Sequence, residues 1–475
     1  MPRLVGNLLS RMPGSNATTS RDGICSPPED LRPLSLRLNF SWTFVANVVY
    51  SGCQFGLLVA LARLGSTEMV GRYALGLAIT APIFMFASLS LATIQATDAG
   101  NEYNPGQYIG LRLATSALAL LGVGLVVWFA GYGPEVGPLV MLIGLAKTVE
   151  SLSDILYGIF MRRERLDLVA QSMIVRGILS LACFALALRA TGHLEAAVLA
   201  LIIVWLAVLV GFDRPHAARL APLAPAVGRR TLLGLAWLAL PLGLVTGANS
   251  FGQQLPRLFL ERVNGETELG IFAAIASLAA AGNIVAYGLS RSAAPRLAQY
   301  WAEGAVAEFR ALVQRLVSLG ALVGLACAVG ALLVGRPFLG VVFGSEYAAR
   351  KAVLIWIVLA TGMNTTGTFL GTAVTAARKF PVQLLVHSGK IAVIAFVCLL
   401  FGRRYGALAA ALALLAGGVF SNLAFLAIAI RLVRRRAEEV AGARGLVMRP
   451  GGRGAPREIG GLVAVARAGI QEAER

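Results

Sequence analysis

The fold is decided by the stretch Gly137–Phe160, GPLVMLIGLAKTVESLSDILYGIF, which is long and apolar enough to cross a membrane and yet carries three charges. Lys147, Glu150 and Asp154 fall at i, i+3 and i+7, so a helix with a 3.6-residue period places them in one sector. A charge at the centre of a bilayer costs about 2.5–3.5 kcal/mol. We therefore expect this sector to face a polar cavity inside the protein.

The rest of the chain fits a membrane protein. It has 475 residues, of which 57% are hydrophobic and 14% are charged. A span of roughly 30 Å of hydrocarbon needs about 20 apolar residues. We count twelve such stretches: Phe40–Leu61, Met69–Ala92, Tyr108–Tyr132, Gly137–Phe160, Leu168–Leu188, Leu194–Phe212, Leu232–Gln253, Leu269–Ser290, Val313–Val334, Val353–Ala376, Val382–Phe401 and Gly406–Ile430. The sequence predicts an all-α, polytopic membrane protein with about twelve transmembrane helices.

The spans divide into two related halves. We expect a polar tail (1–38), a lobe of six spans (39–212), a linker (213–231), a second lobe of six spans (232–432) and a basic tail (433–475). An ungapped offset of 199 residues pairs Gly71 with Gly270, and an offset of 214 pairs Arg176 with Lys390. Six is an even number, so both copies cross the membrane in the same sense. Such parallel repeats place a site between two lobes.

The net charge of +18 is distributed as in a membrane protein rather than a nucleic-acid-binding protein. Arginines gather in the segments that share a side with the N-terminus, such as 162–165 and 434–436, whereas the opposite loops, which include Arg257, hold fewer. The positive-inside rule then places both termini in the cytoplasm. We expect anionic membrane lipid, and no nucleic acid, to contact the basic tails.

Unpaired cations are the first candidates for cargo binding. Arg176 and Lys390 lie mid-way along apolar stretches and have no acidic residue within a turn or two of their own helices. If the repeat holds, they face each other across the pseudo-axis, where an anion such as a phosphate would neutralise them. Arg112 and Arg291 could add to an access route, although snorkelling to the membrane interface is the favoured explanation for them.

Two further groups could serve transport. A carboxylate of Glu150 or Asp154, beside Lys147, could exchange an ion as the cavity changes access; alternatively Lys147 and Glu150 form a structural ion pair. Neutral polar strips suit hydroxyl-rich cargo or helix–helix hydrogen bonds. Their members are Asn47, Ser51 and Gln54 on the first span, Asn249 and Gln253 on the seventh, and Asn364 on the tenth.

Enzymatic chemistry is not expected. The three histidines are scattered, no metal-type cysteine spacing occurs, and no Walker A phosphate loop is present. A membrane-embedded glycan polymerase would need a cluster of catalytic groups in an outer loop, and the outer loops are short. We expect no cofactor, no metal and no catalytic residue.

Several segments resemble the Wzx-type oligosaccharide (O-antigen) flippases of the MOP superfamily. The first runs from Gly71-Arg-Tyr73 through Tyr73-Ala-Leu-Gly-Leu-Ala-Ile-Thr-Ala-Pro82-Ile-Phe to Ile94-Gln95-Ala-Thr-Asp98-Ala. The Arg162–Arg165 loop and the segment Val342-Phe343-Gly344-Ser345-Glu346-Tyr347-Ala348, similar to the family's FGxEY element, also fit. The resemblance covers roughly residues 38–432.

This resemblance implies a MATE-like pair of lobes in a V, working by alternating access in a bacterial inner membrane. Its cargo would be an undecaprenyl-diphosphate-linked oligosaccharide, moved outward for polysaccharide biosynthesis, with a glycan polymerase and chain-length machinery as possible partners. Two alternatives within the superfamily stay open. A cation-coupled multidrug or metabolite exporter would use the acidic residues, and a lipid II flippase would normally have fourteen spans and basic residues in the first two.

Overall fold

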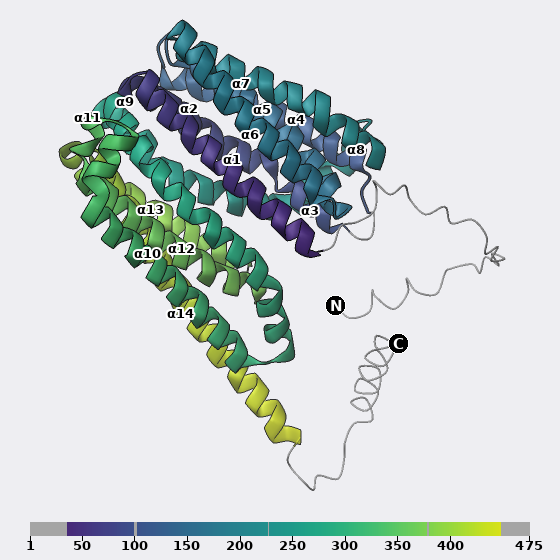
Figure 1. Cartoon of the computed structure of the whole chain (residues 1–475). Helices are drawn as coiled ribbons and strands as arrows, with labels where there is room; N and C mark the ends of the chain where they lie inside the picture. The colour runs from purple at the N-terminus through teal and green to yellow at the C-terminus, as the bar shows by residue number, and fades with distance from the viewer. Residues whose placement is uncertain (1–35, 99–101, 227, 378–379, 448–475) are drawn as a thin grey trace, which may run out of the picture.

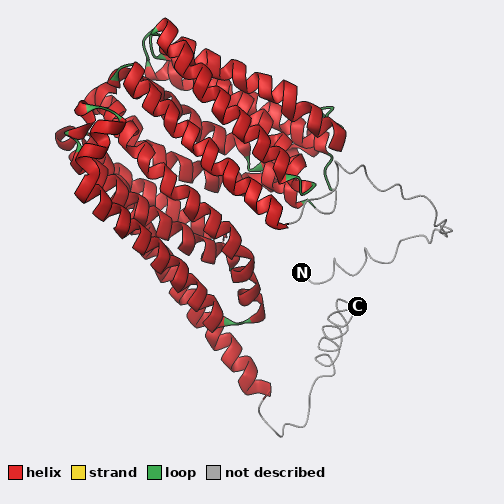
Figure 2. Cartoon of the chain, viewed as in Figure 1, coloured by secondary structure: helices red, strands yellow, loops and turns green. Residues whose placement is uncertain are grey.

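The computed structural model describes residues 36–98, 102–226, 228–377 and 380–447. This part of the chain consists of helices joined by short loops, without strands (Figure 2). The first half holds α1 (Leu36–Leu64), α2 (Thr67–Ser88), α3 (Leu91–Thr97), α4 (Pro105–Ala130), α5 (Gly137–Arg162), α6 (Leu166–Thr191), α7 (Leu194–Val208), a π-helical turn (Leu209–Asp213) and α8 (Arg214–Leu220). The second holds α9 (Arg229–Glu303), α10 (Val306–Val342), α11 (Ser345–Ala348), α12 (Lys351–Ala376), α13 (Phe380–Tyr405) and α14 (Ala407–Val447). The all-α prediction is confirmed.

Ten helices of the described chain are long and apolar enough to cross a membrane. The difference from the predicted twelve has two causes. Helix α5 has 26 residues, but Lys147, Glu150 and Asp154 make it more charged than an ordinary span. Helix α9 has 75 residues, which would extend about 110 Å if straight. Its backbone turns at Gly265 (φ 85°, ψ 178°), so it consists of two arms, 229–264 and 266–303, that correspond to the seventh and eighth predicted spans.

The helices form two lobes (Figure 1). Helices α1–α8 pack together as the N-lobe, and α10–α14 pack together as the C-lobe. Helix α9 joins them. Its first arm lies against α2, where an added side-chain carbon at Gly247 would approach Phe86 to 2.9 Å, and further along it lines a cavity of the C-lobe. The predicted linker 213–231 begins inside the N-lobe, because Asp213 is buried and α8 follows it as helix.

Large apolar side chains cover the outer faces of both lobes. Trp128 and Phe129 at the end of α4 are 81% and 82% exposed, and Leu333 and Val341 on α10 are 77% and 76% exposed. A water-soluble protein of this size rarely exposes such continuous apolar surface. In a bilayer these side chains face lipid, and the aromatic pair suits the membrane–water interface.

The lobes meet at one end and diverge toward the other (Figure 1). The closed end contains the turn after α1, the turn at Gly265 and the turn before α11. The open end contains Leu36 and the turn between α9 and α10. At the closed end Arg72 bonds Glu266 on α9 at 2.6 Å, and Thr67 donates to Glu346 on α11 at 2.7 Å.

The tightest contact at the closed end joins equivalent positions of the two repeats. A side-chain carbon added at Gly71 would lie 1.9 Å from the carbonyl oxygen of Glu266, and one added at Gly270 would lie 2.0 Å from that of Thr67. The offset of 199 relates Gly71 to Gly270 and Thr67 to Glu266. The contact therefore has the reciprocal form of a two-fold interface, in which each copy gives the other the same surface. Small residues allow such close crossing of membrane helices, and the geometry supports the predicted repeat.

Candidate functional site

The charged sector of α5 lies inside the N-lobe and is neutralised there. Lys147 Nζ donates to Glu150 Oε2 at 2.6 Å, and Arg112 on α4 donates to Asp154 Oδ2 at 2.5 Å. The Arg112 side chain is 1% exposed, whereas that of Asp154 is 48% exposed. The alternative of a structural ion pair between Lys147 and Glu150 is therefore what the structure contains. Arg112 is enclosed in the lobe rather than extended to a membrane interface.

Arg176 also has an internal partner, contrary to the expectation that it is unpaired and faces cargo. Its guanidinium bonds Asp213 at 3.2 Å, and the two side chains are 3% and 0% exposed. The rings of Tyr157 and Trp205 lie 5.7 and 5.6 Å from the guanidinium carbon, and Trp205 is held by a 2.8 Å hydrogen bond to Ser180. Because the π-helical turn after α7 carries Asp213 into the lobe, Arg176 is covered and does not face Lys390.

This pair gives a stability prediction. Replacing Asp213 by alanine leaves the Arg176 charge buried without its partner, which costs about 3–5 kcal/mol. We expect a large fall in the thermal unfolding temperature of the purified protein in detergent. Replacing both residues by leucine should restore most of it, because an apolar pair of similar volume removes the uncompensated charge. An unchanged unfolding temperature for Asp213→Ala would contradict the assigned pairing.

The polar strip on α1 borders a cavity of the N-lobe with an empty volume of about 650 Å³. Gln54 lines it together with Tyr50, Lys147, Glu150 and Trp205. Asn47 donates to the carbonyl oxygen of Thr43 at 2.7 Å, and Ser51 is half-buried on the same helix. The described lining of this cavity thus holds one ion pair and neutral groups, so the cavity presents no uncompensated cation to an anionic ligand.

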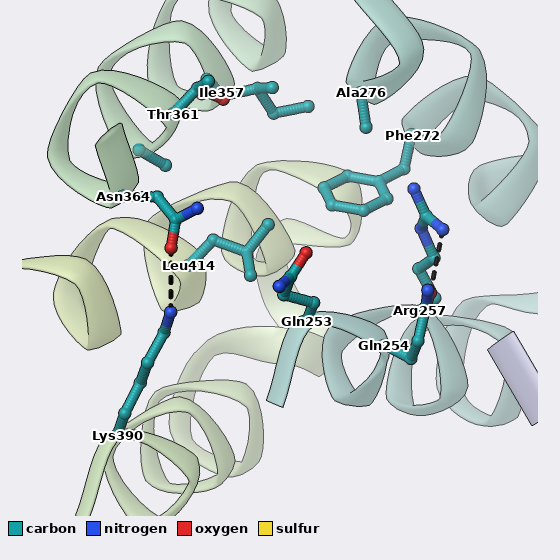
Figure 3. A pocket seen from close by; sticks show the side chains of 11 residues that line it. Gln253, Gln254, Arg257, Phe272, Ala276, Ile357, Thr361, Asn364, Lys390 and Leu414 are labelled. Atoms are coloured by element: carbon teal, nitrogen blue, oxygen red, sulfur yellow. Dashed lines mark hydrogen bonds between the residues drawn. The ribbon is translucent and has the colours of Figure 1, made fainter. Parts of the chain in front are cut away.

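The C-lobe differs, because two cations line one of its cavities without a carboxylate partner among the described residues. Lys390 on α13 donates to Asn364 Oδ1 at 3.1 Å, and Arg257 on α9 donates to Gln254 Oε1 at 2.8 Å. They lie on opposite sides of the cavity, and Gln253 projects between them (Figure 3). The empty space between these side chains is about 710 Å³, including the part that is open to solvent. We call this space the cationic chamber.

Arg257 is the site residue that sequence reasoning missed. The seventh span was expected to end at Gln253, and Arg257 was placed in an outer loop. The first arm of α9 instead continues through Pro256 to the turn at Gly265, so the guanidinium lies within the lobe. The expected length of about 20 residues for a transmembrane span misplaced the end of this helix, because the first arm of α9 is longer than a bilayer requires.

A second cavity adjoins the cationic chamber and shares Asn364 and Lys390 with it. Its empty volume is about 650 Å³. Its other lining residues come from α9, α12, α13 and α14 and include Asn249, Thr368, Thr372, Thr375, Gln383 and His387. We call it the threonine chamber. Of the predicted neutral strip, Gln253 lies in the cationic chamber, Asn249 in the threonine chamber and Asn364 between them. The side chain of Arg291 lies outside the described residues.

Comparison with known proteins agrees with this architecture. The MATE transporter VcmN of Vibrio cholerae superposes with a TM-score of 0.60 at 14% identity, over 84% of this chain and 96% of VcmN. A MOP superfamily transporter from Pyrococcus furiosus gives 0.61 at 13% identity, over 86% and 97% of the two chains. At these identities the likeness concerns the fold. Two lobes with polar cavities enclosed by apolar outer faces define a multi-pass membrane protein with the fold of these transporters.

Sequence comparison then gives the family. Residues 36–301 match the model of the polysaccharide biosynthesis protein family. The capsular polysaccharide biosynthesis protein CapF of Staphylococcus aureus is 30% identical over 364 residues, which cover 76% of this chain and 90% of CapF. The chain belongs to the polysaccharide biosynthesis protein family.

Proposed function

We propose that the protein is a flippase that carries an undecaprenyl-diphosphate-linked oligosaccharide across a bacterial inner membrane for the synthesis of a surface polysaccharide. The family membership and the MATE-like fold support a flippase for polysaccharide precursors. Both the family and the fold are those of transport proteins, and we infer no catalytic step for this protein.

One observation carries the proposal for the cargo. Lys147, Arg112 and Arg176 inside the N-lobe are paired with carboxylates. Among the described residues, Arg257 and Lys390 in the C-lobe have only carboxamide partners. A buried charge without a counter-charge is costly, so these two side chains favour an anionic ligand. A diphosphate supplies two negative centres that charge-assisted hydrogen bonds can hold. A cationic drug would be repelled by the same pair.

The arrangement of the lobes suits a lipid-linked cargo. The distribution of arginines favours a cytoplasmic position for both termini, and the open end then faces the cytoplasm, where the precursor is made. Because the lobes diverge there, the isoprenoid can stay in the bilayer while the diphosphate and glycan enter. The glycan polymerase and chain-length machinery are the partners that such a flippase would supply.

Ion coupling is assigned to the charged sector of α5. The Asp154 carboxylate is the half-exposed member, while its partner Arg112 is buried. A cation or proton that reaches Asp154 would compete with Arg112 for the carboxylate. A change in this ion pair would alter the electrostatic environment of Glu150 and Lys147 on the same helix. On this proposal the coupling groups lie in the N-lobe and the cargo groups in the C-lobe.

A strain lacking the gene tests the function. We expect loss of surface polysaccharide and accumulation of undecaprenyl-linked intermediates in the cytoplasmic leaflet, both reversed by the wild-type gene. Leaflet position is measured by accessibility of the glycan to a membrane-impermeant oxidant in oriented vesicles. Normal polysaccharide together with altered export of cationic drugs would instead indicate a multidrug exporter. Loss of peptidoglycan precursor transport would indicate a lipid II flippase.

A further inference from the structure

We propose that the threonine chamber is a sugar subsite. It binds the glycosyl residue attached to the diphosphate, through groups that form hydrogen bonds with neutral hydroxyls. The inference rests on the proposed function, because Lys390, at the border of the two chambers, is assigned to the diphosphate. It adds a second half to the site and names the residues that select the sugar.

The position of the chamber follows from the course of α12. Thr368, Thr372 and Thr375 are spaced by four and three residues, so they lie on one face of the helix. They follow Asn364 in the direction of Ala376, away from α11 and the closed end. The threonine chamber therefore extends from Lys390 toward the open end, along the route by which a glycan would enter.

The hydrogen bonds of Thr368 and Thr372 leave their hydroxyl groups available as acceptors. Each hydroxyl donates its hydrogen to a backbone carbonyl four residues earlier: Thr368 to Asn364, Thr372 to Thr368 and Thr375 to Gly371, all at 2.9 Å. Gln383 Nε2 already donates to the hydroxyl oxygen of Thr375 at 2.5 Å. The remaining capacity of Thr368 and Thr372 is their oxygen lone pairs, because a hydroxyl has one hydrogen to give. A sugar hydroxyl is a donor that suits these oxygens.

Other polar side chains that line the chamber can also donate hydrogen bonds. The carboxamide of Asn249 has no hydrogen-bond partner in the described structure, so both its donor and its acceptor atoms are free. The Nδ1 atom of His387 is buried without a partner, and its ring packs edge-on to Phe425 at 6.1 Å. None of the described residues that line the chamber is acidic. Buried polar atoms left without partners are costly, and a hydroxyl-rich ligand would satisfy them.

Two glycines leave room for this ligand. A side-chain carbon added at Gly371 would meet nothing nearer than 3.8 Å, and one added at Gly367 nothing nearer than 3.6 Å. Both are ordinary contact distances, so no packing requirement of the protein explains a glycine there. The unfilled space lies within the chamber that both glycines line.

The test compares binding with and without a sugar. Purified protein in lipid nanodiscs is titrated with undecaprenyl diphosphate and with the same lipid carrying one hexose or one N-acetylhexosamine. We expect at least one of the two sugars to raise wild-type affinity above that of the sugar-free lipid. The double variant Thr368→Val/Thr372→Val should lose roughly tenfold in affinity for that glycosylated lipid, as expected for two hydrogen bonds, and should keep its affinity for the sugar-free lipid.

Two variants guard against effects on folding. Thr246→Val is the matched control, since Thr246 on α9 donates to the backbone carbonyl of Leu242, four residues earlier, at 3.1 Å and lines neither chamber. This variant should keep the gain in affinity that the sugar gives to wild type. Gly371→Ala adds a methyl group to the chamber and improves helix propensity, so it should lower the sugar increment without lowering the unfolding temperature.

The outcomes separate the two proposals. If wild-type protein binds all three lipids equally, or the double valine variant keeps the full sugar increment, the sugar subsite is wrong while diphosphate binding stands. If the double variant weakens the sugar-free lipid as much as the glycosylated one, the subsite is wrong as well. If wild-type protein binds none of the three, the proposed function fails and the subsite with it.

Discussion

Replacing both Arg257 and Lys390 by alanine should abolish flipping. Each side chain is expected to make a charge-assisted hydrogen bond to the diphosphate, worth about 1.5–3 kcal/mol. Loss of both corresponds to roughly a hundredfold to ten-thousandfold weaker binding, since each 1.4 kcal/mol is a factor of about ten. The measurement is the rate at which a labelled lipid-linked sugar crosses the membrane of proteoliposomes, together with surface polysaccharide in a complemented deletion strain.

Charge and position can be separated with two controls. The exchange variant Arg257→Lys/Lys390→Arg keeps both cations and should retain part of the activity. Arg262→Ala removes a cation from the same arm of α9, but its guanidinium donates to the carbonyl oxygen of Ala130 at the closed end, so flipping should persist. Wild-type flipping by the double alanine variant would overturn the assignment of the diphosphate site.

Replacing Gly71 or Gly270 by valine should prevent the closed end from closing. The added carbon would lie 1.9–2.0 Å from a backbone oxygen of the facing helix, whereas ordinary contacts begin at 3.4 Å, so α2 and α9 must separate by about 1.5 Å. Such overpacking costs about 1–3 kcal/mol, which shifts a two-state equilibrium roughly 5- to 150-fold. Either variant should therefore favour a form that is open at this end, and transport should fall because the cycle needs both forms.

The shift can be followed by the distance between spin labels at Leu64 and Ser345, placed on a cysteine-free background. We expect the short-distance population of wild type to be replaced by a longer one in Gly71→Val and Gly270→Val. The matched control is Gly52→Val on α1, where an added carbon meets nothing within 4 Å. A distance distribution like that of wild type in both variants would mean that this contact does not control closure.

Much of the architecture was predictable because it depends on local periodicity and composition. The helical period placed Lys147, Glu150 and Asp154 on one face of α5, and the structure places all three inside the N-lobe. Apolar stretches of about 20 residues located the spans, although the charges of α5 and the length of α9 blurred the count. The offset of 199 paired Gly71 with Gly270, and the structure places both glycines at a reciprocal contact, since a repeat in sequence becomes symmetry in space.

The candidate site was predicted less completely, because its residues come from separate helices. Arg176 and Lys390 carry equal charges at equivalent positions of the repeat, and nothing in their own helices distinguishes them. Asp213, 37 residues beyond Arg176, was taken for part of a linker and proved to be its partner. Arg257 was assigned to a loop, since the seventh span was expected to end at Gln253.

By itself, then, the sequence determined that this protein is a helical membrane protein built from two repeated halves, with charges turned inward, because these properties follow from the apolar length and helical period of single segments. Only the tertiary structure decided which charges remain for cargo. Pairing depends on which helices meet, and here Arg112, Lys147 and Arg176 meet carboxylates whereas Arg257 and Lys390 meet carboxamides. In a low-dielectric interior a carboxylate neutralises a buried cation and forms a structural ion pair, whereas a carboxamide leaves the charge available to bind an anion.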